Sequence, residues 1–200
     1  MAKKSTRNTR GRIVSAAWKL FYEQGYEDTT VEEIIELSGT SKGSFYHYFD
    51  GKDALLSTLS SLFDEKYEEL TGLLTPEMTA MEQLLFLNRE LFHMIEDSIS
   101  LDLLARLYST QLTTNGEKHL LDHNRIYYKL LRKIIAKGQA EGQLSSRSNV
   151  NEMVKLYALC ERALLYDWCL CAGEYALTEY SAKVLPGSVS YTHLRAPRDS

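Results

Sequence analysis

Residues 39–52 read GTSKGSFYHYFDGK and bring aromatic rings, lysines and glycines together in one short segment. A helix over this segment turns about 100° per residue and divides the side chains between two faces. One face carries Lys42, Gly43, Tyr46 and His47, and the other carries Ser41, Phe45 and Tyr48. The first face suits a DNA groove, because a lysine and a phenol donate to phosphates or base edges and a glycine lets the backbone come close. The rings of the second face, together with Phe49, are expected to fill a small core.

Positive charge is concentrated at the N-terminal end of the chain. The net charge is −4, yet residues 1–12 contain basic side chains and no acidic one, namely Lys3, Lys4, Arg7, Arg10 and Arg12. A basic end on an acidic body is expected where one end alone meets a polyanion. Thr30 and Lys52 stand near expected helix starts, where free backbone amides help to hold phosphates.

Histidines offer an alternative from another functional class. His119 and His123 are spaced i and i+4, which suits zinc, and with His93 and nearby carboxylates they could serve an all-helical metal enzyme. Leu120 follows His119, so the HExxH protease motif is absent. No nucleophile, base and oxyanion arrangement is visible, and we expect no catalytic residue, metal or cofactor. A third alternative keeps the fold but makes the protein a binding module without DNA affinity.

The elements that must position these residues are all helices. Apolar spacing predicts a helix over 9–24, ended by Gly25. Thr30 and Glu33 have the spacing of a capping box for a second helix that stops at Ser38-Gly39. Thr40 or Ser41 is expected to cap the third helix. Asp50, which has Asp53 three residues after it, is expected to cap the fourth. Two short helices joined by a glycine-containing turn and packed on a longer one form a helix-turn-helix.

The rest of the chain also has a helical pattern and no alternating strand pattern. Helices are expected at roughly 77–97, 100–112, 117–140 and 149–172, the last capped by Asn149 and Glu152, so the fold class is all-α. No run approaches the ~18 apolar residues of a membrane span, and no signal-peptide pattern follows the basic start. We therefore expect a cytoplasmic protein without a membrane partner.

The segment TRGRIVSAAWKLFYEQGYEDTTVEEIIELSGTSKGSFYHYFDGKDALL resembles the DNA-binding domain of the tetracycline-repressor (TetR) family of bacterial transcriptional regulators. The resemblance implies a three-helix DNA-binding domain and a larger helical domain that binds a small molecule and forms a homodimer. It implies a repressor that binds a pseudo-palindromic operator and is released by an effector. The expected divisions are residues 1–52, residues 53–187 and a disordered or non-native tail over residues 188–200.

Family contacts carry over to specific positions in this sequence. The DNA-binding set is expected to comprise Thr30, Thr40, Ser41, Lys42, Gly43, Ser44, Tyr46, His47 and Lys52. Polar-tipped rings of the later helices suit a ligand cavity, and the expected lining is His93, Tyr108, Tyr127, Tyr128 and Trp168. The family dimerises through two C-terminal helices, and here the second is expected to stop early, at Leu185-Pro186-Gly187.

Overall fold

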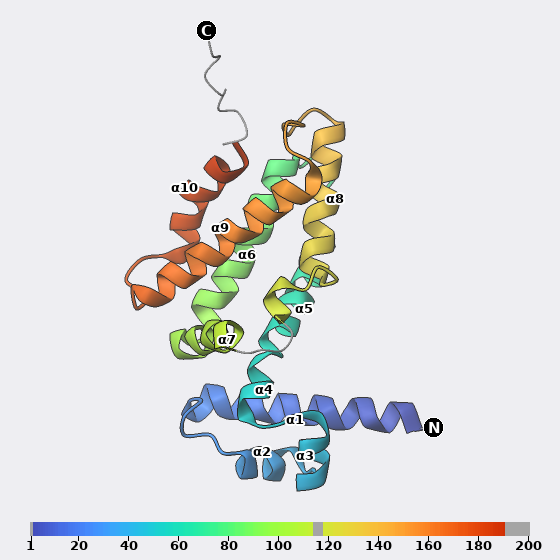
Figure 1. Cartoon of the computed structure of the whole chain (residues 1–200), viewed down its shortest axis with the longest axis vertical. Helices are drawn as coiled ribbons and strands as arrows, with labels where there is room; N and C mark the ends of the chain where they lie inside the picture. Colours follow the sequence, from blue (N-terminus) through green and yellow to red (C-terminus); the bar gives the residue numbers. More distant parts are fainter. Residues whose placement is uncertain (1, 114–117, 191–200) are drawn as a thin grey trace. The chain divides into compact units, whose positions relative to one another are not determined.

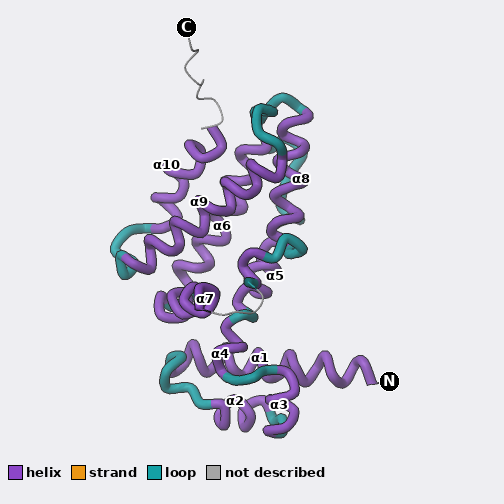
Figure 2. The backbone as a smooth tube through the Cα atoms, viewed as in Figure 1, coloured by secondary structure: helices purple, strands orange, loops and turns teal. Residues whose placement is uncertain are grey.

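The computed structural model describes the backbone of residues 2–113 and 118–190, and the side chains of 9–113 and 118–188. Within these ranges every regular element is helical, and Figure 2 shows purple helices joined by teal loops with no orange strand. None of the described helices is both long and apolar enough to cross a membrane. The predicted all-α fold class is therefore confirmed.

The chain folds as two compact units. The first contains residues 1–62 and 102–120, and the second contains residues 63–101 and 121–200. The expected boundary at 52 and 53 falls inside the first unit, and that unit also takes in a later segment that the sequence pattern did not connect with it. We describe each unit separately.

The first unit is built on the long helix α1 (Ala2–Gln24), against which α2 (Val31–Ser38) and α3 (Lys42–Tyr48) pack (Figure 1). The short helix α4 (Lys52–Leu56) and the start of α5 (Leu59–Thr71) follow. Its core consists of apolar side chains from all these helices, including Ile13, Ala17, Phe21, Ile34, Phe45 and Leu55. Most of α7 (Leu101–Thr113) and the 3₁₀ turn His119–Leu121 complete the unit.

The second unit packs α6 (Ala80–Ser98) against α8 (Ile126–Ala140) and α10 (Leu177–Ser190), and α9 (Val150–Leu170) contacts both α8 and α10. Thr79 and Glu82 form a capping box at the start of α6, and Asn149 and Glu152 form another at the start of α9. The second of these was predicted, and the first was missed. Asp64 of α5 accepts hydrogen bonds of 2.9 and 3.0 Å from Arg125 immediately before α8.

Four local predictions were wrong. α1 begins at Ala2, not at residue 9 as the apolar spacing predicted, so the backbone of residues 2–8 continues the helix. Gly51, not Asp50, is the N-cap of α4. His119 lies in a 3₁₀ turn and His123 in the following loop, so they do not share a helix face. α10 runs through Pro186 to Ser190, and residues 191–200 of the expected tail lie outside the described residues.

Candidate nucleic-acid interface

Helix α3 is fixed in place by caps and by two buried rings. The Ser41 hydroxyl accepts a hydrogen bond of 3.1 Å from the Ser44 amide, which decides between the two expected N-caps. Phe45 is fully buried and Phe49 nearly so, with their ring centroids 6.0 Å apart. Tyr48 is half-buried. The inner face predicted from periodicity is the one that packs.

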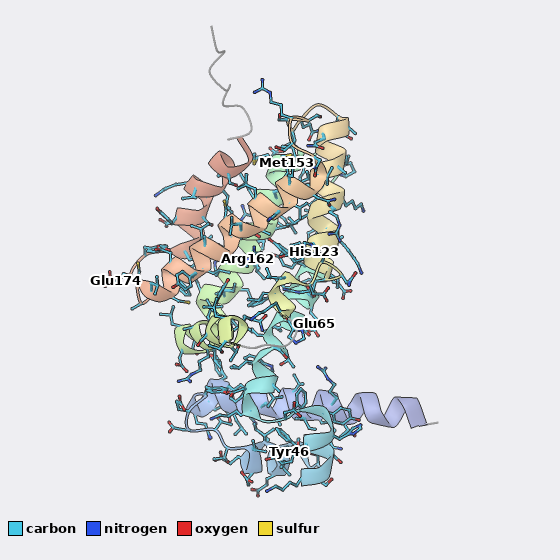
Figure 3. All side chains as sticks on the ribbon, in the orientation of Figure 1. Tyr46, Glu65, His123, Met153, Arg162 and Glu174 are labelled. Atoms are coloured by element: carbon cyan, nitrogen blue, oxygen red, sulfur yellow. The ribbon has the colours of Figure 1, made fainter. Side chains whose placement is uncertain are left out.

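The opposite face of α3 is open. This face is exposed at Lys42, Gly43, Tyr46 and His47. Tyr46, labelled in Figure 3, is 46% exposed to solvent. A Cβ at Gly43 would meet nothing within 4 Å, so the backbone there is accessible to a partner. Lys42 contacts Glu32 of α2 at 3.4 Å, a pair so exposed that a phosphate could replace the carboxylate at little cost.

Two hydroxyl groups of the predicted set, those of Thr30 and Ser41, act as helix N-caps. The Thr30 side chain and the Glu33 side chain form the reciprocal capping box, which lowers the pKa of Glu33 through the Thr30 amide and then the Thr30 hydroxyl. Thr40 lies 2.8 Å from the Ser38 hydroxyl, and Ser41 lies 2.9 Å from Ser44. The exposed cap hydroxyls, Thr30 and Ser41, stand beside helical amides where a phosphate is favourable.

Lys52 is placed differently from the sequence prediction. Its ammonium group donates to the backbone carbonyls of Tyr26, Glu27 and Thr29 at 2.6, 3.2 and 2.8 Å. Since an ammonium has three N–H donors, this set uses all of them. The geometry therefore favours an internal role for Lys52 over the predicted phosphate contact.

The turn before α3 depends on Gly39. Its φ of 59° lies in the left-handed region, and a Cβ there would come within 2.7 Å of the Arg12 guanidinium. Arg12 donates to the carbonyls of Ser38 and Gly39, the latter at 2.7 Å. This basic residue of α1 thereby caps the end of α2, which the charge pattern alone did not reveal.

The predicted ligand-pocket residues differ in their surroundings. Tyr127, Tyr128 and Trp168 are buried in the packing of the second unit, His93 is exposed beside Asp97, and Tyr108 belongs to the first unit. In the described part of the chain, no group of three or more histidine, cysteine or acidic side chains could hold a metal. The predicted ligand residues thus differ in burial and belong to both units.

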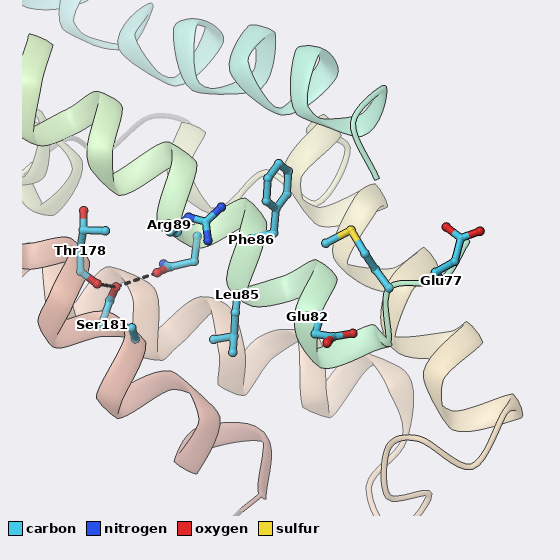
Figure 4. Close-up of a pocket in the computed structure, with 10 residues that line it drawn as sticks. Glu77, Glu82, Leu85, Phe86, Arg89, Thr178 and Ser181 are labelled. Atoms are coloured by element: carbon cyan, nitrogen blue, oxygen red, sulfur yellow. Dashed lines mark hydrogen bonds between the residues drawn. The ribbon is translucent and has the colours of Figure 1, made fainter. Parts of the chain in front are cut away.

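A groove of about 620 Å³ lies instead between α6 and α10 (Figure 4), and we call it the α6–α10 groove. Its lining comprises Glu77, Met78, Glu82, Leu85, Phe86, Asn88, Arg89, Thr178, Ser181 and Ala182. The volume is in the usual range for small-molecule sites. The dashed line from Ser181 toward α6 in Figure 4 is its hydrogen bond of 2.8 Å to the buried Asn88 side chain.

A buried polar chain continues from the floor of this groove. Asn88 donates at 2.8 Å to Glu161 of α9, and Tyr127 of α8 donates to the other carboxyl oxygen. Burial raises the pKa of Glu161 to about 7, against the opposing effect of these donors. The sequence did contain a signal for Asn88 and Glu161, since both are polar residues at helical positions whose neighbours on that face are apolar.

Comparison with known proteins agrees with a helix-turn-helix at the N-terminal end of the chain. Residues 13–59 match the profile described as "Bacterial regulatory proteins, tetR family". The regulator QacR of Staphylococcus aureus is 36% identical over 62 residues, which cover 31% of this chain and 33% of QacR. For QacR and four other curated regulators, the matched segment covers between 22% and 33% of the length of the relative.

Two matches extend over nearly the whole chain. The fatty acid metabolism regulator protein of Bacillus subtilis is 24% identical over 186 residues, covering 91% of this chain and 94% of the relative. The solved structure of Thermus thermophilus FadR, described as a TetR-family repressor in complex with lauroyl-CoA, has a TM-score of 0.74. Its sequence identity is 25%, with coverage of 96% of this chain and 99% of that one. Together with the helix-turn-helix, these matches show that the chain has a DNA-binding domain similar to that of the TetR family and the fold of solved TetR-family regulators.

Proposed function

We propose that the protein is a ligand-responsive repressor that binds a pseudo-palindromic DNA operator as a homodimer in the cytoplasm, without catalysis. The observation that carries the proposal is α3, a capped helix with buried Phe45 and Phe49 below an exposed face of Lys42, Gly43, Tyr46 and His47. Such a helix fits the major groove of DNA, and two copies in a dimer would lie about 34–36 Å apart, one helical turn.

The DNA-binding proposal is tested by selecting fragments from genomic DNA and measuring operator affinity at fixed salt. We expect Tyr46→Ala and Lys42→Ala each to weaken binding by about tenfold, because each removes a base or phosphate contact worth roughly 1–3 kcal/mol. Both side chains are exposed, so thermal stability should not change. Tyr22→Ala, which removes an exposed tyrosine of α1, is the matched control. Unchanged affinity in both α3 variants would rule out this reading face.

The dimer proposal rests on an exposed apolar stripe of the second unit. Its members lie on α9 and α10 and are Leu156, Leu159, Tyr166, Leu170, Tyr180 and Val184. The α9 positions differ by three, seven and four residues and therefore share one helix face. A contiguous apolar face of this kind is a typical protein contact surface. A second copy of the chain is the occupant that a symmetric operator requires.

The α6–α10 groove is our candidate for the effector site. Its charged residues are Glu77, Glu82 and Arg89, and Arg89 is already paired with Glu90 at 2.8 Å. The acidic balance favours a neutral or cationic amphipathic molecule resting on Met78 and Leu85. This differs from the lauroyl-CoA and stearoyl-CoA held by two structural relatives, since coenzyme A carries several negative charges.

Calorimetric titration with dodecylamine and with lauroyl-CoA, which share one alkyl chain length, tests the groove. We expect dodecylamine to bind at least tenfold more tightly, and Ala182→Trp to abolish that binding by filling the groove while leaving operator affinity intact. Tighter binding of lauroyl-CoA, or dodecylamine binding that survives Ala182→Trp, would refute this location and charge preference. The DNA-binding proposal would be unaffected by either result.

A further inference from the structure

The ring of Tyr26, in the turn between α1 and α2, is contacted by two cations. The Lys52 ammonium lies 4.3 Å from the ring centroid, and the Arg106 guanidinium carbon lies 4.9 Å from it. The Tyr26 hydroxyl donates to Asp53. Burial, and then Asp53, raises the pKa of Tyr26, which keeps the hydroxyl protonated as a donor. We call Tyr26, Lys52, Asp53 and Arg106 the Tyr26 clamp.

The clamp joins both ends of the helix-turn-helix. Lys52 follows α3 by four residues, and its three carbonyl acceptors belong to residues 26–29, immediately before the Thr30 cap of α2. The entry to α2 and the exit from α3 are therefore bonded to each other. A change in the position of residues 26–29 must change the support of the exposed α3 face.

Arg106 is the only member of the clamp that comes from a distant part of the chain. Arg106 lies on α7. Its guanidinium pairs with Glu27, which lies beside Tyr26 in the turn between α1 and α2, and its Nε donates to Asp102 at 2.8 Å. The hydrogen bond to Asp102 is the largest cause of the raised pKa of Arg106. The guanidinium is thus oriented by one carboxylate, bound to a second, and stacked on the Tyr26 ring, a geometry that a lysine reproduces only in part.

We propose that Arg106 is a positioning residue for DNA binding, which holds the α1–α2 turn through Tyr26 and Glu27 and so fixes the helix-turn-helix without touching DNA. The proposal rests on the proposed DNA-binding function. It also assigns Lys52 to the clamp, in place of the phosphate contact predicted from sequence. A residue that positions the helix-turn-helix affects the DNA-free protein and leaves the salt dependence of binding unchanged, whereas a residue that contacts a phosphate does not.

Hydrogen exchange on the DNA-free protein tests the clamp directly. We expect Arg106→Gln to speed exchange at the amides of Ile34 and Leu55 by about fivefold, as the loss of an ion pair and a stacked cation implies. Amides of α8 and α9 should be unaffected. Arg106→Lys should restore most of the protection, because it keeps a cation over the ring. Arg132→Gln is the control, since Arg132 is an arginine of α8 that lies outside both the clamp and the α6–α10 groove and donates at 2.7 Å to the His123 carbonyl.

The salt dependence of operator binding separates positioning from contact. We expect Arg106→Gln and Lys52→Gln to lower affinity by about fivefold while the slope of log K against log salt stays at the wild-type value. A slope shallower by about 0.9 would mean that the altered residue neutralises a phosphate, which would overturn its place in the clamp. If Arg106→Gln exchanged its amides and bound the operator as the Arg132→Gln control does, the proposal would be overturned as well. If the wild type selected no DNA, the proposed function would be refuted. The hydrogen-exchange comparison would still show whether Arg106 holds the α1–α2 turn, because it is made on the DNA-free protein.

Discussion

At the scale of single residues, Glu161 shows how one buried carboxyl group can join several helices. It accepts hydrogen bonds from Asn88 of α6 and Tyr127 of α8, and Asn88 in turn accepts one from Ser181 of α10. Tyr157, one turn before Glu161, donates at 2.9 Å to the Leu84 carbonyl. A half-satisfied network of this kind would be costly, but among the described side chains no buried polar atom lacks a partner.

The raised pKa of Glu161 makes stability depend on pH. The unfolded carboxyl group loses its proton near its ordinary pKa of 4.5, whereas the folded one keeps it to about 7. Between these values the folded state binds more protons, so the free energy of unfolding falls as pH rises, by on the order of 3 kcal/mol in all. Glu161→Gln lacks this ionisation, and its stability relative to wild type should rise by that amount from pH 5 to pH 8.

Urea denaturation at several pH values measures this difference. Glu96→Gln serves as a control, because Glu96 is another carboxylate of α6 that accepts hydrogen bonds from a second helix, through the backbone amides of Leu177 and Thr178 at the start of α10. A constant difference between Glu161→Gln and wild type across the range would show that Glu161 does not retain its proton in the folded protein.

At the scale of elements, α6 and α8 approach each other closely at one point. A Cβ on Gly138 would lie 2.5 Å from the Ala80 Cβ and 2.9 Å from Leu144. Neither the Ala80 methyl group nor the backbone that carries it can move aside without shifting a helix. Gly138 is therefore required by the packing of α8 against α6, and the adjacent Gln139 donates at 2.8 Å to the carbonyls of Ser145 and Ser148 in the loop that follows α8.

We expect Gly138→Ala to lower the free energy of unfolding by roughly 1–3 kcal/mol, the usual cost of overpacking a close contact. Gly11→Ala is the matched control, because Gly11 lies inside α1 and a Cβ there meets nothing within 4 Å. That change should raise stability by about 0.5–1 kcal/mol through helix propensity. Thermal and chemical denaturation would measure both, and a stabilised Gly138→Ala would disprove the close approach.

Periodicity and capping chemistry predicted the elements well, because both act over a few residues. The division of α3 into a buried Phe45 face and an exposed Tyr46 face followed from its period, and the Thr30 and Asn149 caps from their spacing. The partners of Lys52 could not be predicted in this way, since they depend on contacts between segments more than 20 residues apart. The same holds for the α6–α10 groove, whose walls are far apart in sequence.

At the scale of the whole molecule, the exposed stripe on α9 and α10 is the surface through which we propose that two copies associate. Leu159 is 52% exposed in the single chain, near the middle of the stripe. Because a charge buried in such an interface costs on the order of 3 kcal/mol, Leu159→Glu should weaken dimerisation by about a hundredfold. Operator affinity should fall with it, while the helical content of the chain remains.

Sedimentation over a range of concentrations would measure this effect. Leu73→Glu is the control, since Leu73 is 57% exposed in the loop after α5 and lies outside the stripe. It should leave the association constant unchanged. Equal behaviour of the two variants would mean that the dimer, if formed, uses another surface.

The first unit is discontinuous, because residues 102–120 fold with residues 1–62. A chimera could be built by grafting the N-terminal domain of this protein onto the ligand domain of another regulator. Here such a chimera cut after residue 62 would leave Arg106 behind and place an unmatched α7 beside Tyr26. A functional exchange of DNA specificity would therefore have to transfer α7 as well, or restore an arginine at the corresponding position of the recipient.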